Sequence, residues 1–217
     1  MNPNLISILV LAGIAVFLIL RLKNVLGTRD GFEPPREAAA PKSKKPGFEV
    51  IEGGPDRDIT DHVAENSAAA KALSKMKAAE PSFGVTDFLG GAKGAYEMIL
   101  MGFETGDLSQ IKTFLSEDVL SAFEQVIKAR EEQGLTIEAE FSGVRETTLH
   151  DASFDDATGE AEVTVKFIGE LTYVVRDATG EIVEGSESQV KRQKDTWTFA
   201  RIMGADDPNW QLVATGE

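Results

Sequence analysis

The sequence predicts an α+β protein in which helices pack on an antiparallel sheet, behind an N-terminal transmembrane helix. Three observations predict this. Leu5 to Leu20 is an uncharged apolar run in which only Ser7 is polar. Apolar residues then recur at helical spacing from about residue 86, and after Gly134 the period of the pattern changes to two. Helical spacing buries one face of a helix and alternation buries one face of a strand, so helices precede a set of long strands.

The apolar run is long enough to cross a bilayer. As a helix its sixteen residues would span roughly 24 Å, close to the thickness of the hydrocarbon core. Arg21, Lys23 and Arg29 follow it on one side only. We therefore expect residues 1–26 to be a transmembrane anchor, with the C-terminal bulk in the cytoplasm by the positive-inside rule. A signal peptide and a buried core helix are the alternatives. The first lacks a basic segment before the run, and the second lacks a domain directly after it.

The composition excludes several classes of function. The chain has 36 Asp and Glu against 22 Lys and Arg, for a net charge of −14. So acidic a protein does not bind nucleic acid through its general field, and anionic headgroups repel most of its surface. It has no cysteine, which excludes disulfides, thiolate chemistry and cysteine-ligated metals.

Residues 27–81 read as a flexible charged linker. Their first half mixes Pro, Ala and Lys with little to bury, as in an extended tether. From Asp58 to Glu80 the sequence becomes rich in Ala and Lys. There it predicts a weakly amphipathic helix, which could lie on the membrane, dock a partner or act as a spacer. Its apolar face would carry Ile59, Val63, Ala70, Leu73 and Met76.

The folded domain is expected at residues 82–217, and it begins with helices. A first helix ends at Gly106, and Asp107 with Gln110 offers the capping pair of a short second helix. Ser116 caps a third helix, which Gly134 ends. The buried face of the first helix is Phe88, Ala92, Tyr96, Ile99 and Phe103, and that of the third is Leu120, Phe123, Val126 and Ile127.

Four strands follow the helices. The first alternates from Leu135 to Phe141, and the second places Ala161 to Tyr173 on one parity. A third run covers about 183–202 and a short fourth covers 210–214. The tetrapeptide Asp-Ala-Thr-Gly occurs twice, ending at Gly159 and at Gly180. Both copies suit tight hairpin turns with glycine in the left-handed region, which predicts antiparallel pairing.

Two stretches carry a resemblance to a known family. They are FLGGAKGAYEMILMGFETGDLSQIKTFLS in the helical half and WTFARIMGADDPNWQLVAT at the C-terminal end. With the anchor and linker before them, they resemble the Tim44-like domain proteins of alphaproteobacteria, relatives of the C-terminal domain of the mitochondrial import-motor adaptor Tim44. The resemblance covers about residues 86–214. It implies a strongly curved antiparallel sheet wrapped on helices, similar to the cystatin-like or NTF2-like cone with a hydrophobic cavity.

The resemblance also implies a function and a location. It implies a membrane-anchored adaptor or scaffold in protein translocation or membrane-protein assembly, single-pass in the bacterial inner membrane. The implied partners are proteins of the translocation or assembly machinery, a chaperone among them, and phospholipid. A lipid-binding or small-ligand-binding module on the same cone is the alternative function.

No constellation of catalytic residues is evident, and we expect no enzyme, cofactor or metal site. His62 lies in the linker, and His150 adjoins Asp151, whose side chain would point to the opposite face of a strand. There is no nucleophile elbow, phosphate-binding loop or metal-ligand spacing. What remains is a set of aromatic residues on core-facing parities, which either fill the core or line an open cavity. The candidate pocket residues are Tyr96, Phe103, Phe123, Phe141, Phe167, Tyr173 and Trp197.

Overall fold

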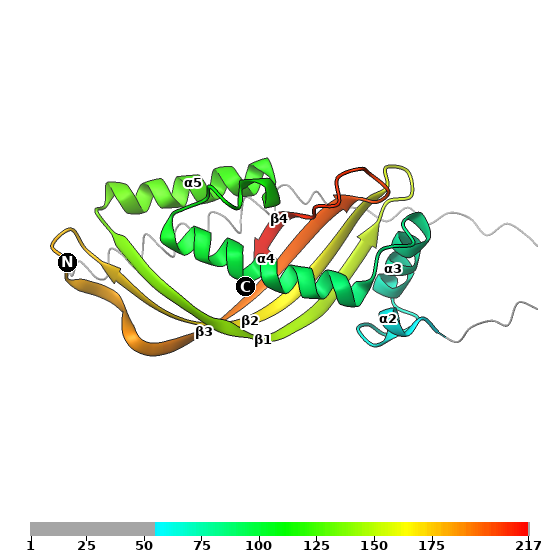
Figure 1. Cartoon of the computed structure of the whole chain (residues 1–217), viewed down its shortest axis with the longest axis horizontal. Coiled ribbons are helices and arrows are strands. Elements are labelled where there is room, and N and C mark those ends of the chain that lie inside the picture. The colour runs from blue at the N-terminus through cyan, green and yellow to red at the C-terminus, as the bar shows by residue number, and fades with distance from the viewer. Residues whose placement is uncertain (1–54, 217) are drawn as a thin grey trace, which may run out of the picture.

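A computed structural model describes residues 55–216 of the chain. Three main helices lie against one four-stranded antiparallel sheet, which confirms the α+β class (Figure 1). The transmembrane anchor predicted at residues 1–26 and the first half of the linker lie outside the described residues. Within residues 55–216, no helix combines the length and apolarity needed to span a membrane. The elements in chain order are α2 (Arg57–Thr60), α3 (Ala68–Ala79), α4 (Val85–Thr105), η1 (Lys112–Phe114), α5 (Glu117–Glu132), β1 (Thr136–Phe154), β2 (Glu160–Arg176), β3 (Ile182–Ile202) and β4 (Gln211–Gly216).

The helix ends follow the capping signals of the sequence. Gly106 ends α4 in the left-handed region at φ 80°. The Ser116 side chain accepts a hydrogen bond from the backbone N–H of Val119 at the start of α5. The short helix expected after Asp107 is instead a turn followed by the single 3₁₀ turn η1. Asp107 accepts from the backbone N–H of Ser109, two residues on, and such an Asx turn competes with the helical cap.

The sheet has the order β1-β2-β3-β4, with every neighbouring pair antiparallel. Gly159 and Gly180 occupy the left-handed region in the two predicted hairpin turns, at φ 75° and 85°. Three register shifts interrupt β1, the first between Phe141 and Gly143. Such bulges bend and twist a strand. The long strands curve as an open arc, and α4 lies across their concave side (Figure 1).

β3 carries the largest irregularity of the sheet. Lys191 pairs with Leu171, whereas Ser186 pairs with Tyr173, so residues 187–190 of β3 stand opposite a single residue of β2. We call residues 187–190 the β3 bulge. Gly185 precedes it at φ 83°, and a Cβ there would lie 2.1 Å from the carbonyl oxygen of Tyr173. Only glycine therefore fits the point where the register changes.

The helix expected in the linker is part of the core. α3 packs on β1, and Leu73 and Met76 have no solvent-accessible surface. Polar contacts fix its C-terminal end: Lys77 pairs with Asp56 and Asp58, and Glu80, just after α3, pairs with Arg201 of β3. The sequence indicated the apolar face of α3 but not its burial, because much of that face is alanine and a weak amphipathic pattern does not distinguish a membrane, a partner or the chain's own sheet.

Candidate functional site

Six of the seven predicted pocket residues pack in or against the hydrophobic core. The Tyr96 ring stacks on Phe167 with centroids 4.4 Å apart, and it lies 4.7 Å from Trp197 and 6.2 Å from Phe141. Phe103 and Phe123 form a second pair at 4.4 Å. Tyr96, Phe167, Trp197 and Phe123 are buried, and Phe103 and Phe141 are partly buried. The seventh residue, Tyr173, lies apart and lines a cavity.

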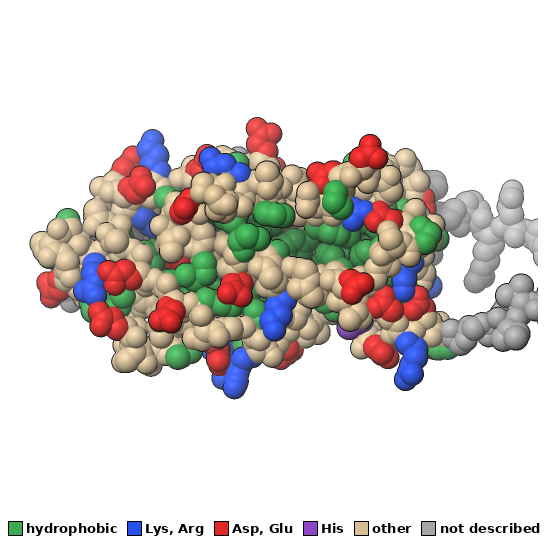
Figure 2. Space-filling view, viewed as in Figure 1, with side chains coloured by type: hydrophobic (Ala, Val, Ile, Leu, Met, Phe, Trp, Pro, Cys, Tyr) green, Lys and Arg blue, Asp and Glu red, His purple; other side chains and the backbone are tan. Residues whose placement is uncertain are grey.

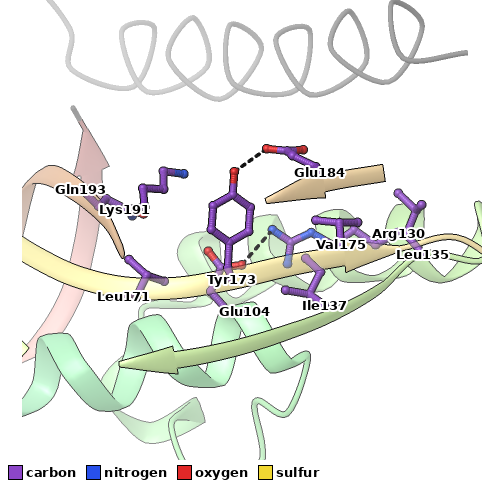
Figure 3. A pocket seen from close by; sticks show the side chains of 10 residues that line it. All are labelled: Glu104, Arg130, Leu135, Ile137, Leu171, Tyr173, Val175, Glu184, Lys191 and Gln193. Carbon is purple, nitrogen blue, oxygen red and sulfur yellow. Dashed lines mark hydrogen bonds and ion pairs between the residues drawn. The ribbon is translucent and has the colours of Figure 1, made fainter. Parts of the chain in front are cut away.

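The cavity lies on the concave side of the sheet, where the ends of α4 and α5 face the first half of β3. Its volume is about 210 Å³. Figure 3 shows the Tyr173 ring standing in its middle, with charged side chains above and beside the ring. Figure 2 shows that apolar side chains are also recessed along the middle of this face of the molecule, with acidic side chains around them. The residues that line the cavity give it an apolar floor and charged walls. Its lining is Glu104, Arg130, Leu135, Ile137, Leu171, Tyr173, Val175, Glu184, Lys191 and Gln193.

Glu104 and Arg130 form a loose ion pair in the cavity wall. Their closest N–O distance is 3.8 Å, although both side chains are only 16% exposed. The Arg130 guanidinium donates to the carbonyl oxygen of Phe103 at 3.1 Å and stacks 4.4 Å above that ring, and its buried Nε has no hydrogen-bond partner. Burial raises the pKa of Glu104 and lowers that of Arg130, and their mutual attraction does not offset it. The attraction between Glu104 and Arg130 therefore does not fully offset the cost of burying their two charges.

Tyr173 is held in place by groups from β3. Its hydroxyl donates to Glu184 at 2.7 Å, and the Lys191 ammonium lies 4.5 Å from the ring centroid. Burial, together with the hydrogen bond to the Glu184 carboxylate, raises the pKa of Tyr173 to about 12. The ring is therefore neutral at physiological pH. It offers an apolar face that already binds one ammonium group of the same chain.

Tyr96 lies in the hydrophobic core and does not line the cavity. Its hydroxyl donates to Asp195 at 2.5 Å, and the Tyr96 side chain has no exposed surface. Burial and the nearby Asp195 carboxylate raise the pKa of Tyr96 far above its ordinary value. Gly169 makes room for this hydroxyl, since a Cβ at Gly169 would lie 2.8 Å from it. A tyrosine so enclosed anchors the sheet and has no access to a substrate.

Sequence reasoning missed most of the polar residues of this site. Glu104, Arg130 and the β3 residues Glu184 and Lys191 come from three separate elements, and each reads locally as part of a solvated face. One signal was available for Arg130, which lies in the last turn of a helix, where cations are favoured. His62 contacts Thr86 at an exposed site, and His150 is exposed on β1, so neither lies in the cavity. Residues 55–216 contain no cluster suited to a metal ion.

Three comparisons relate the chain to known proteins. The family model described as "Tim44-like domain" matches residues 69–217. Mitochondrial import inner membrane translocase subunit TIM44-1 of Arabidopsis thaliana is 22% identical over 163 residues, covering 72% of this chain and 34% of that protein. The chain thus spans about a third of the length of this relative. The crystal structure of the intermembrane space region of the chloroplast protein ARC6 aligns with a TM-score of 0.40 at 10% identity, over 57% of this chain and 88% of that one.

Proposed function

Because the chain belongs to the Tim44-like domain family, we propose that it acts in protein translocation at a membrane, as a tethered domain that binds polypeptides. The observation that carries this proposal is the family match, which spans residues 69–217 and includes α3, the cavity and all four strands. The identity of the Arabidopsis relative supports a role in this process, since that protein is a translocase subunit of an inner membrane.

The cavity at Tyr173 is the surface that we propose for binding. Its floor of Leu135, Leu171 and Val175 suits an apolar side chain, and its charged rim suits the polar groups of a polypeptide. The ionisable groups of the rim contact one another: Glu104 faces Arg130, and Tyr173 contacts both Glu184 and Lys191. Such mutual pairing favours binding over acid–base chemistry, which needs a group free to exchange a proton with a substrate.

The membrane attachment is proposed from the sequence alone. We propose that residues 1–26 anchor the chain and that residues 27–54 tether the domain, on the cytoplasmic side of a bacterial inner membrane. We also propose that the solvent-exposed surface of this domain makes the adaptor contacts, to a chaperone or to the assembly machinery. The apolar cavity floor supports a second candidate, a lipid-binding or small-ligand-binding module of the NTF2-like kind.

Photocrosslinking in native membranes tests the proposal. A photoreactive phenylalanine analogue replaces Tyr173 in the full-length chain, and a matched variant carries it at the exposed Lys93 of α4. The proposal expects Tyr173 to crosslink to translocation components or to chains in transit, and Lys93 to give little product. Lipid or small-molecule adducts at Tyr173, without protein products, would favour the second candidate. Equal protein products at both positions would contradict the assignment of the binding surface.

A further inference from the structure

The outer edge of β3 is only partly paired. β4 pairs with Thr196–Ala200, and within residues 55–216 no strand pairs with the same edge of β3 before Thr196. The β3 bulge interrupts this open edge, but residues 191–195 keep a regular register with β2. Alternate residues there direct backbone N–H and C=O groups outward, where a further strand would bind them. We call residues 191–195 the open edge of β3.

The open edge presents different chemistry on its two faces. Lys191 and Gln193 line the concave cavity. Arg192 and Lys194 pair with Glu170 and Ile168 of β2, on the convex face of the sheet. Because successive side chains of a strand alternate between faces, a strand added beside the open edge would point every second side chain over the cavity. The others would lie beside Arg192 and Lys194.

The cations of the convex face are incompletely neutralised. Arg192 and Arg145 share the single carboxylate of Glu170, at 3.2 and 3.1 Å. Neither Lys194 nor Lys166 has an ion pair among the described residues. Lys166 lies on the same face of the sheet, on β2, two residues before Ile168, the cross-strand partner of Lys194. An acidic side chain directly across from Arg192 or Lys194 would therefore be attracted, and a basic one repelled.

We propose that the open edge of β3 binds an extended segment of a partner protein in which apolar and acidic residues alternate. The apolar side chains would enter the cavity around Tyr173, and the acidic ones would face Arg192 and Lys194. This proposal rests on the proposed function, because it specifies how a polypeptide is bound. Cationic side chains commonly protect an open edge from pairing with apolar strands. Here they would also select an acidic partner strand, in the mode of strand addition.

The test uses a synthetic peptide and the protein from residue 55 onward, or the full-length chain in detergent if the shorter protein does not fold. The probe is a fluorescein-labelled eight-residue peptide that alternates valine and glutamate, at 0.15 M salt. Its controls replace every glutamate by lysine, or methylate the backbone nitrogens of either the valines or the glutamates. The protein variants are Lys194→Glu at the open edge and Lys93→Glu on α4, both of exposed lysines. Binding is followed by fluorescence anisotropy and by amide hydrogen exchange.

Strand addition predicts a distinct set of results. The glutamate peptide binds and slows exchange in residues 191–195, whereas the lysine peptide does not bind. One N-methylated peptide loses binding and the other keeps it, since the amides that face β3 belong to one alternate set. Lys194→Glu weakens binding about 3- to 10-fold, because a favourable cross-strand pair becomes a repulsive one, and Lys93→Glu leaves it unchanged. No binding, or equal binding of both N-methylated peptides, would overturn the inference. Partner crosslinks from Tyr173 would still support the proposed function in that case.

Discussion

The two ends of the curved sheet are built in opposite ways. At one end, which we call the clasped end, α3 and the start of α4 pack on β1, and polar contacts join α3 and Glu80 to the turns that follow β1 and β3. Glu80 there accepts from Arg201 and from the backbone N–H of Gly204, and Phe88 packs edge-on against Trp210 at 4.7 Å. At the cavity end, around Tyr173, Glu104 and Arg130 stand 3.8 Å apart, and the adjoining edge of β3 is open. We therefore expect the clasped end to supply stability, and we propose that the cavity end supplies the binding groups.

Removing α2 and α3 tests the clasped end with the largest expected effect. The sequence placed the domain start at residue 82, which makes this truncation the natural one to compare with a chain that starts at residue 55. Leu73 and Met76 are fully buried, and losing each side chain costs about 2–5 kcal/mol. The chain from residue 55 should unfold cooperatively in a thermal scan, whereas the chain from residue 82 should be unfolded or aggregate. Equal stability of the two would mean that α3 is a spacer.

The buried ion pair of the clasped end gives the next largest effect. The Arg201 side chain is 9% exposed and the Glu80 side chain 20%, so Glu80→Gln leaves a buried cation without its countercharge. We expect a loss of about 3 kcal/mol in the free energy of unfolding, measured in urea. Glu187→Gln is the matched control at the cavity end, where Glu187 is 67% exposed and pairs with Arg176. Glu187→Gln should lower the free energy of unfolding by less than about 1 kcal/mol. Similar losses in both variants would contradict the contrast between the two ends.

Gly169 lies between the two ends, and its substitution should have an intermediate effect. Gly169→Ala places a methyl group 2.8 Å from the Tyr96 hydroxyl, which forces the ring or the strand to move at a cost of about 1–3 kcal/mol. Gly94→Ala is the control, since its Cβ would meet nothing within 4 Å. In the middle of α4 it should stabilise by about 0.5–1 kcal/mol. Thermal unfolding of both variants should therefore shift in opposite directions, and a neutral Gly169→Ala would show that the close approach is not constrained.

The pH dependence of stability should separate the two ends with the smallest effects. At the clasped end, burial alone would raise the pKa of Asp58, but hydrogen bonds from Lys77, Thr86 and Val85 hold it well below its usual range. The stability it contributes is present at neutral pH and is lost below about pH 4. At the cavity end, the raised pKa of Glu104 has the opposite effect on the pH dependence of stability. Stability is greatest when this carboxyl is protonated, and it declines as the pH rises above about 4.5.

Urea midpoints from pH 3 to pH 8 measure this contrast. Asp58→Asn should flatten the fall in stability at acid pH, and Glu104→Gln should flatten the decline toward neutral pH. The reverse assignment, or identical profiles for the two variants, would contradict the electrostatic difference between the ends.

The sequence predicted the elements better than their environments. Periodicity located α4, α5 and the strands, and the repeated turn motif indicated the hairpins, because these signals are local. The burial of α3 was missed, since its alanine-rich face gives no hint of which surface covers it. The charged lining of the cavity was missed for another reason. Glu104 and Lys191 are far apart in the chain, and only the bulges and curvature of the sheet bring them near Tyr173. The predicted aromatic residues were correctly read as inward-facing, but a parity pattern does not distinguish a filled core from an open cavity.

The central claim is that the cavity end binds polypeptides while the clasped end maintains the fold. The most direct test compares Tyr173→Ala with Phe83→Ala, a buried clasped-end residue, in full-length chains that carry a crosslinker at Gln193. Crosslinked protein partners in native membranes are quantified per folded molecule, with the folded fraction taken from protease resistance. The account predicts that Tyr173→Ala lowers the yield about tenfold while Phe83→Ala lowers only the folded fraction. An unchanged yield per folded molecule in Tyr173→Ala would contradict it.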